Sequence, residues 1–473
     1  MFFNSYLFII VFLPLLMVVY YWLSKIIDSN NVAYVVITAA SLFFCFYSGY
    51  KNGAFIVAEI AVNFLFYIVL QRKRSRALLA LFISANVIFL GIFKYLDMAI
   101  TIADAFLKMN LQITNIEAPL GISFITFQQI AFLVYVYKNP EVKIGVLPYS
   151  VFVSFFPHVM SGPILFVENF FDNFKKKIGK VDWNNLSAGF LLFTIGLAKK
   201  TLLADVYGRM VDAGYNALDA MNLGSALFVS VAYTLQIYFD FSGYCDMAIG
   251  IGKMLNIELP INFNSPYKAA TIDEFWDRWH MTLTRFLTRY VYIPLGGNRK
   301  GLVRTYVNIM LIFLLSGLWH GASLTFVLWG FLHGGAMVFS RIFKSAIVRV
   351  PRVISQVITF LFVNFAWIIF RAGTFTTLRG MLRAFIRPGF YLTEELTGAF
   401  DKVGVFTVNL GNKPLTMLTF VIIGLVLVFV QKNSNEIVEN CKWKWYSAVS
   451  AAILLILCVL SFTGTSTYIY LRF

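Results

Sequence analysis

Two of the four histidines of this sequence each follow a tryptophan inside an apolar stretch. His280 ends the segment F-W-D-R-W-H, and His320 lies within L-W-H-G-A. An imidazole held away from water is costly unless it is hydrogen-bonded, and polar groups at membrane depth usually mark function. These two histidines are therefore our leading candidates for a buried functional site.

His320 has the stronger sequence context. Gly317 and Gly321 lie on either side of it, and glycine lets another backbone or a ligand approach closely. A histidine at such a break is suited to take the proton from an acceptor hydroxyl that attacks a thioester. General-base catalysis of this kind is worth about 10²–10⁴-fold in rate. The alternative is a hydrogen-bonded histidine that serves only packing.

The context of His280 is more evenly balanced. A helix through it would place Trp276 and Thr284 on the same face, four residues before and after. Asp277 and Arg278 indicate polar surroundings, so the segment is predicted either to be re-entrant or to line a cavity. The alternative is a structural histidine bonded to the backbone.

The other polar candidates favour structural roles. His158 and His333 have glycine or proline neighbours and little further context. Asp240 and Asp246 are six residues apart and share no clean helical face, which favours capping or pairing with a basic residue over acid–base work. The histidines lack the short spacing of zinc ligands, and no thiol or carboxylate cluster accompanies them. We therefore expect no metal and no bound cofactor.

The elements that must position these residues are predicted to be membrane helices. The 473 residues are 59% hydrophobic and 13% charged, whereas a soluble chain carries about 25% charged residues. The predicted fold class is all-α and polytopic, with about eleven transmembrane helices of roughly 20 residues each, plus re-entrant and interfacial helices. The predicted spans include Tyr6–Leu23, Val32–Tyr50, Gly53–Leu70, Ala77–Phe93, Leu186–Leu197, Ala226–Phe241, Val353–Phe370, Met417–Val430 and Ala448–Ser461.

Several segments are predicted to depart from simple spans. Pro119–Gln129 is interrupted by proline and glycine and is a candidate re-entrant element, because irregular backbone at membrane depth must line a protein cavity. Val151–Val159 runs into a second such break at His158. Ala99–Leu111 and the arginine-rich Phe375–Ile386 are predicted to be interfacial helices.

The formal charge of +16 has a topological explanation. The basic residues gather in short segments between spans, above all Gln71–Arg76 (Q-R-K-R-S-R), as the positive-inside rule requires. This places that loop in the cytoplasm and the N-terminus on the extracytoplasmic side, and it favours a lipid bilayer over nucleic acid as the partner. A second possible cause of the positive charge is an electropositive entrance to a site that binds an anionic donor, and the sequence leaves this open.

Six segments together resemble the membrane-bound O-acyltransferase (MBOAT) family, in its bacterial alginate- and peptidoglycan-type polysaccharide O-acetylation branch. The resemblance covers essentially the whole chain, and the combination of segments is specific. The segments are Leu235–Ala248, Phe275–His280, Tyr292–Arg299, Leu318–Ala322, Asn364–Ala372 and the terminal Y-I-Y-L-R-F.

The resemblance implies a bowl of helices around a central tunnel, in one integral membrane domain over residues 1–473. Residues 1–97 and 351–473 would supply the N- and C-terminal spans and 98–350 the catalytic core. His320 matches the family's catalytic histidine, acting as general base or transient acyl acceptor, and His280 matches its second signature histidine. Further tunnel candidates are Trp276, Trp279, Trp319, Gly321, Asn298 and Arg299.

The resemblance also implies the substrates and partners. The donor would be acetyl-CoA or another acyl thioester, with an acyl carrier protein as the alternative, on the cytoplasmic side of the inner membrane. An extracytoplasmic partner transferase of the serine–histidine–aspartate (SGNH) type would then modify a cell-envelope or secreted polysaccharide. The sequence departs from the family at Asp277, where members often have a basic residue, and at Thr288-Arg289-Tyr290 in place of R-D-Y.

Three alternatives stay open from the sequence. D-alanyl transfer to teichoic acid from a carrier protein is the nearest within the family. A transporter or flippase of a polysaccharide precursor fits the hydropathy equally well, although no internal repeat supports it. A non-catalytic scaffold would leave the buried histidines as needless cost.

Overall fold

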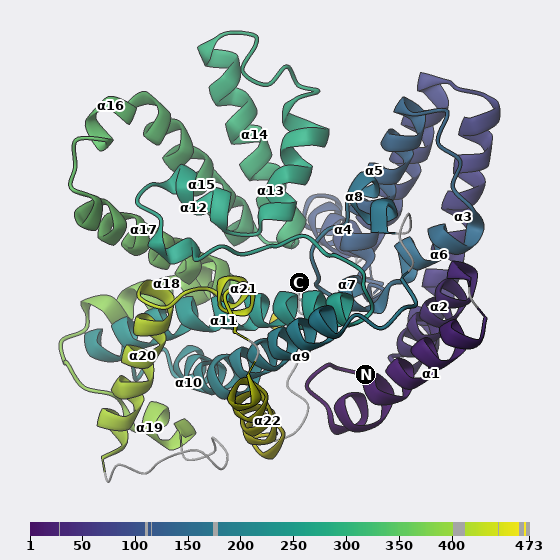
Figure 1. Ribbon diagram of the computed structural model, residues 1–473. Coiled ribbons are helices and arrows are strands. Elements are labelled where there is room, and N and C mark those ends of the chain that lie inside the picture. The colour runs from purple at the N-terminus through teal and green to yellow at the C-terminus, as the bar shows by residue number, and fades with distance from the viewer. Residues whose placement is uncertain are drawn as a thin grey trace. The chain divides into compact units, whose positions relative to one another are not determined.

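The structure is a computed structural model that describes residues 1–27, 29–108, 112–114, 116–173, 178–400, 412–442, 444–462 and 468–469. Most of these residues lie in helices (Figure 1). The described residues contain no β-strand, and their one isolated bridge pairs Phe263 with Trp279. The chain forms two compact units, Met1–Phe190 with Ala248–Pro260, and Leu191–Met247 with Ile261–Phe473.

Membrane-spanning helices dominate the described part of the chain, which confirms the predicted all-α polytopic fold. Seven helices there are long and apolar enough to cross a bilayer, and four shorter apolar helices accompany them. In lipid, a helix satisfies its own backbone hydrogen bonds, so apolar side chains can face outward without cost. The seven are Leu7–Ile26, Asn30–Tyr47, Tyr50–Arg72, Arg76–Leu107, Trp183–Asn216, Leu302–His320 and Arg352–Ala372.

The first unit contains the N-terminal helices. After a π-helical turn at Leu7–Phe12 its helices are α1 (Leu13–Ile26), α2 (Asn30–Tyr47), α3 (Tyr50–Arg72), α4 (Arg76–Leu107), α5 (Ile122–Lys138), α6 (Val146–Ser154), α7 (Phe156–Val159) and α8 (Val167–Asp172). The helices α9 (Trp183–Ala198) and α11 (Leu223–Met254) belong in part to each unit.

Two predictions for this unit need correction. The expected separation of a span at Ala77–Phe93 from an interfacial helix at Ala99–Leu111 is wrong, because α4 is continuous; residues 94–98 contain neither proline nor glycine to end it. Residues 109–111 of that expected helix lie outside the described residues. The expected irregular element at Pro119–Gln129 is irregular only at Pro119–Gly121, where Gly121 is the left-handed N-cap of α5, and residues 122–129 are regular helix. Its re-entrant course stays a prediction. The predicted break near His158 is present, between α6 and α7.

The second unit holds the candidate site. Its further helices are α10 (Asp205–Asn216), α12 (Ile272–Arg278), α13 (Met281–Leu287), α14 (Leu302–His320), α15 (Leu324–Ile342), α16 (Lys344–Ile347), α17 (Arg352–Ala372), α18 (Phe375–Ile386), α19 (Glu394–Phe400), α20 (Lys413–Phe429), α21 (Ser434–Glu439) and α22 (Trp445–Leu460), with π-helical turns at Lys199–Ala204 and Thr288–Tyr292. In Figure 1, α14 and α15 form a hairpin beside α12 and α13.

Two glycines allow the backbones of α14 and α15 to pack in direct contact. A Cβ on Gly317 of α14 would collide with the carbonyl oxygen of Phe326, and one on Gly330 of α15 with that of Phe313. Small residues at such positions are the usual basis of close helix packing in membranes. The hairpin that ends in His320 therefore depends on both glycines.

Replacing Gly330 by alanine is expected to lower the thermal stability of the protein. The added methyl group meets backbone rather than a movable side chain, and overpacking of this kind costs about 1–3 kcal/mol. The matched control is Gly335→Ala on the same helix, where a Cβ meets nothing within 4 Å. Thermal unfolding of the detergent-purified variants would be compared, and equal melting temperatures for the two variants would contradict the assigned packing.

Candidate functional site

His280 lies at a break between α12 and α13. The helix α12 starts where the Thr271 side chain accepts a hydrogen bond from the amide of Glu274, and it ends at Arg278. Trp279 then bridges to Phe263 in extended conformation, and His280 has a left-handed backbone with φ +47°. The predicted helix through His280 is therefore wrong, because this extended pairing interrupts it.

The His280 side chain is buried and held from two directions. Its Nδ1 lies 3.1 Å from Oδ1 of Asn262. The ring of Phe241 on α11 meets it edge-on at 4.8 Å between centroids, and the ring of Trp319 on α14 lies at 6.2 Å. The burial and the polar partner match what a functional imidazole in the membrane requires.

His320 is the last residue of α14 and is also buried. Its ring lies 4.7 Å from that of Trp319, 5.0 Å from that of Phe370 and 5.3 Å from that of Trp329. The ring of Trp319 is thus a neighbour of both histidines. The structure brings together the three residues on which the sequence hypothesis depends most, His280, Trp319 and His320.

His333 belongs to the same aromatic cluster, although sequence reasoning treated it as structural. Its Nδ1 accepts a hydrogen bond from Nε1 of Trp276 at 3.2 Å, and its ring lies 4.7 Å from that of Trp329. Its Nε2 has no hydrogen-bond partner among the described residues. The four-residue spacing of Trp329 and His333 on one helix face was the available signal for this cluster.

The remaining tunnel candidates divide into two groups. Trp279 is buried, stacking on Phe275 at 5.6 Å and contacting Trp367 at 4.9 Å. Asn298 and Arg299 lie on an exposed turn before α14. Their assignment to a tunnel stays a prediction.

The two aspartates of α11 pair with basic residues, as the sequence favoured. Lys199 Nζ lies 2.7 Å from Asp246 Oδ2, and Lys200 Nζ lies 2.6 Å from Asp240 Oδ1 and 2.9 Å from Asp205 Oδ1. The π-helical turn at Lys199–Ala204 contains both lysines. The side chains of the two lysines and of Asp240 and Asp246 are almost fully buried. Each charge therefore has to be compensated by its ion-pair partner, because an unpaired buried charge is strongly destabilising.

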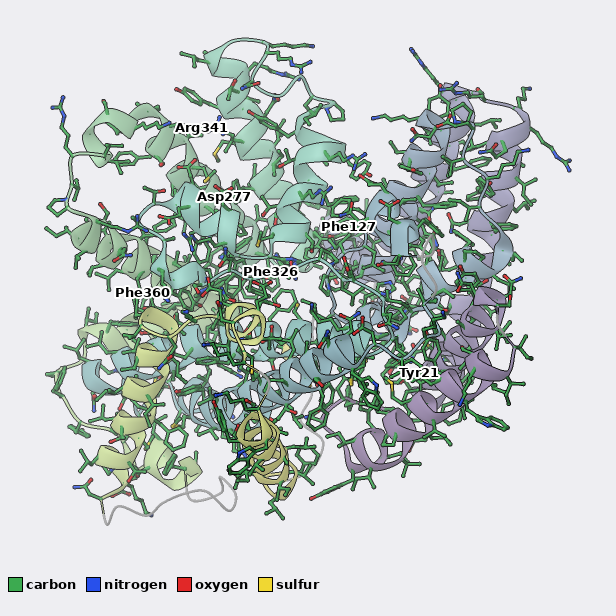
Figure 2. The ribbon with its side chains drawn as sticks, in the orientation of Figure 1. Tyr21, Phe127, Asp277, Phe326, Arg341 and Phe360 are labelled. Atoms are coloured by element: carbon green, nitrogen blue, oxygen red, sulfur yellow. The ribbon has the colours of Figure 1, made fainter. Side chains whose placement is uncertain are left out.

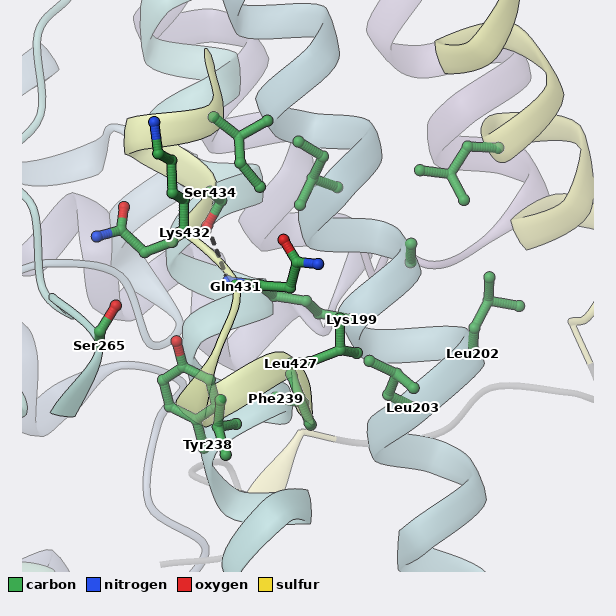
Figure 3. A pocket seen from close by; sticks show the side chains of 16 residues that line it. Lys199, Leu202, Leu203, Tyr238, Phe239, Ser265, Leu427, Gln431, Lys432 and Ser434 are labelled. Atoms are coloured by element: carbon green, nitrogen blue, oxygen red, sulfur yellow. Dashed lines mark hydrogen bonds between the residues drawn. The ribbon is translucent and has the colours of Figure 1, made fainter. Parts of the chain in front are cut away.

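A cavity of about 320 Å³ lies beside the first of these pairs (Figure 3). Lys199 reaches its wall, where its amine donates to Ser434 Oγ at 2.8 Å as well as to Asp246. The other walls are mostly apolar and come from α9, α11, α20, α21 and α22. The amine is already committed to these acceptors, which favours a structural role for it.

A second cavity of about 280 Å³ adjoins the aromatic cluster through Trp276 and Phe313. Asp273, Asp277 and Arg341 supply its charged lining; the latter two, from α12 and α15, are labelled in Figure 2. Partial burial, and after it the neighbouring Asp273, raise the pKa of Asp277 above its usual value. Apolar walls with a few polar groups are typical of a small-molecule site.

The site contains two buried imidazoles, those of His280 and His320. Among the described residues, no three His, Cys, Asp or Glu side chains gather in a way that could hold a metal ion. A neutral imidazole can accept a proton from a hydroxyl group. The arrangement can therefore support general-base catalysis of acyl transfer.

Comparison with known proteins identifies the family. The model of the membrane-bound O-acyltransferase family matches residues 15–376. The chain is 35% identical to a peptidoglycan O-acetyltransferase of Helicobacter pylori, over 100% of this chain and 97% of that protein. It is 33% identical to a probable alginate O-acetylase of Pseudomonas aeruginosa, over 90% and 82% of the two chains.

A more distant similarity, 27% identity over 55% of this chain and 70% of the relative, joins it to a teichoic acid D-alanyltransferase of Bacillus subtilis. The family match and the full-length similarity agree with the buried histidines and the polytopic helical fold. The chain is a member of the membrane-bound O-acyltransferase family, and it is a multi-pass membrane acyltransferase.

Proposed function

We propose that the protein transfers acetyl groups from a cytoplasmic thioester, acetyl-CoA, for O-acetylation of a cell-envelope or secreted polysaccharide. The observation that carries the proposal is the contact of Trp319 with both His280 and His320 inside a buried aromatic cluster. Two relatives that are similar over at least 90% of this chain carry names of O-acetylation, which supports acetyl over D-alanyl transfer.

In the proposed reaction, His320 removes the proton from the acceptor hydroxyl as its oxygen attacks the thioester carbonyl. The new carbon–oxygen ester bond forms, the carbon–sulfur bond breaks, and the proton passes to the leaving thiolate. His280 orients the donor or the proton. Exclusion of water by the surrounding rings protects the thioester from hydrolysis and strengthens the electrostatic interactions inside the site.

The donor is proposed to enter through the 280 Å³ cavity next to Trp276. Its apolar walls suit the extended arm of an acyl thioester, and Thr284, Thr288 and Tyr292 add hydroxyl groups to the lining. The hydroxyl oxygen of Tyr292 is buried without a hydrogen-bond partner in the described part of the chain, so it is available to a ligand amide.

The wider setting follows the family resemblance. We propose an inner-membrane location with the N-terminus extracytoplasmic, since this orients the basic loop Gln71–Arg76 toward the cytoplasm. An extracytoplasmic SGNH-type transferase would receive the acetyl group and pass it to the polysaccharide.

The proposal is tested by ester analysis of cells with and without the gene. Base-labile acetate and D-alanine on isolated polysaccharide and peptidoglycan would be measured, together with thiol release from acetyl-CoA by membranes. We expect acetate ester and thiol release to depend on the gene. Ester-linked D-alanine in place of acetate would indicate that the donor is a carrier protein. If neither ester differs between cells with and without the gene, the proposed acyl transfer is rejected.

Replacing Asp277 by asparagine is expected to lower the KM for acetyl-CoA about two- to fivefold, the scale of one charge several ångströms from the donor phosphates in water. The kcat should stay unchanged, because the charge acts on ground state and transition state alike. Since the pKa of Asp277 is raised, its negative charge develops as pH increases through that pKa. The wild-type KM should therefore rise with pH relative to that of Asp277→Asn.

The measurement is thiol release from acetyl-CoA at several pH values. Glu439→Gln is the control, since it removes an exposed carboxylate that does not line this cavity. Identical KM values for wild type and Asp277→Asn at every pH would contradict the proposal that the donor binds in this cavity.

A further inference from the structure

Asn262 organises the break in which His280 lies. Its Oδ1 accepts hydrogen bonds from the amide of Thr282 at 3.2 Å and from its hydroxyl at 2.9 Å, and it lies 3.1 Å from His280 Nδ1. Its Nδ2 donates to Sγ of Cys245 on α11 at 3.3 Å. Its own backbone carbonyl accepts from the amide of Met281 at 3.0 Å. Asn262 is 1% exposed, so water does not compete for these bonds.

These bonds determine which nitrogen of His280 carries the proton. The amide of Thr282 can only donate, so the atom of Asn262 that faces it must be the carbonyl oxygen. That oxygen can only accept, and His280 Nδ1 must therefore donate to it. In a neutral imidazole the other nitrogen then accepts, which makes Nε2 the basic atom of the ring.

The same residue supports the unusual backbone at this break. A left-handed conformation is unfavourable for a residue with a Cβ, and His280 adopts it with φ +47°. The amides of Met281 and Thr282, the two residues after His280, are held because they donate hydrogen bonds to Asn262. The pairing of Asn264 with Arg278, through a backbone bond of 2.9 Å, holds the residue two before. The position of the ring is thus set from both sides by the segment 262–264.

We propose that Asn262 is a positioning residue that holds His280 in the tautomer with a basic Nε2, next to Trp319 and His320. The inference rests on the proposed acyl transfer, in which His280 orients the donor or the proton. Asn262 does not touch the reacting atoms and acts only through His280. Sequence reasoning did not single it out, since it lies 18 residues before the histidine.

A double-mutant cycle tests this role. The initial rate of polysaccharide acetate ester formation would be measured at matched membrane levels for wild type, Asn262→Ala, His280→Ala and the double variant. We expect Asn262→Ala to lower the rate about tenfold or more, as loss of a residue that orients a functional histidine does. In the His280→Ala background, the same substitution should cause no further loss.

Two conservative variants separate positioning from general support of the fold. Asn262→Asp keeps the oxygen acceptors and should retain most of the rate. Thr282→Val removes one donor to Asn262 but leaves the bond to His280, and its rate should stay near wild type. If Asn262→Ala does not accumulate in the membrane, Asn262→Asp carries the test alone, because an inactive Asp variant at normal level overturns the inference.

The outcomes also distinguish this inference from the proposed function. Additive losses in the cycle, or a fully active His280→Ala beside an inactive His320→Ala, would overturn the positioning role while leaving acyl transfer intact. Full ester formation in both single histidine variants would reject the proposed function itself.

Discussion

His320→Ala is expected to lower the rate of acyl transfer by about 10²–10⁴-fold, the range typical for loss of a general base. The imidazole of His320 is buried against Trp319, Trp329 and Phe370, whose rings cannot take up a proton in its place. The fold should survive, because alanine continues α14 to its natural end at this residue. Ester-linked acetate on the polysaccharide, at matched membrane level, is the measurement.

The chain offers a matched control, a buried histidine that belongs to the first unit. His158 of the first unit is as deeply buried, with its Nε2 3.0 Å from Oε1 of Gln128. His158→Ala should lower stability while the rate per folded molecule stays near wild type. Equal rates for His320→Ala and wild type would show that His320 takes no part in the chemistry. They would favour the transporter hypothesis.

Lys200→Ala is expected to destabilise the protein by about 3–5 kcal/mol, the usual cost of leaving a buried charge without its partner. The amine of Lys200 lies between Asp240 and Asp205, and its side chain is 1% exposed. Asp240 also accepts the amide of Ile469 at 2.8 Å, so the loss extends to the described part of the C-terminal tail. Thermal unfolding of detergent-purified protein would show the change.

Two further variants show whether charge is the cause. Lys432→Ala removes an exposed lysine and should leave the melting temperature unchanged. Lys200→Met combined with Asp240→Leu replaces the pair by apolar groups and should recover a large part of the stability lost in Lys200→Ala. A double variant no more stable than Lys200→Ala would show that the unpaired buried charge is not the main cause of the lost stability.

The sequence predicted the helices best where apolar periodicity and capping agree. The helix α18 has the predicted bounds, Phe375–Ile386, because Thr374 caps it and the basic residues follow one face. The last two spans lie within a few residues of the predicted ones. Where a segment lacks a strong breaker, as residues 94–98 of α4 do, no local signal distinguishes one long helix from two.

The candidate site was predicted in part. The sequence hypothesis placed His280 and His320 at one site, and both rings lie beside that of Trp319. This shared neighbour and the backbone at His280 were not predicted. That backbone depends on the bridge between Phe263 and Trp279, a pairing of segments 16 residues apart that no helical period reveals. Asn262 was missed as a neighbour of the site for the same reason, since its contact with His280 arises only after the chain has folded. His333 was missed although its four-residue spacing from Trp329 was an available signal.

The paired charges of the second unit have a consequence for how the protein is made. Lys199 and Lys200 leave the ribosome about forty residues before Asp246 and Asp240, their partners on α11, although Lys200 also pairs with Asp205 shortly after it. Each lysine costs about 2.5–3.5 kcal/mol at the centre of a lone membrane helix. The earlier helix is therefore poorly stable in the bilayer until α11 arrives beside it. Synthesis thus couples the insertion of the two helices, and a ribosome pause between them would expose the first to quality control.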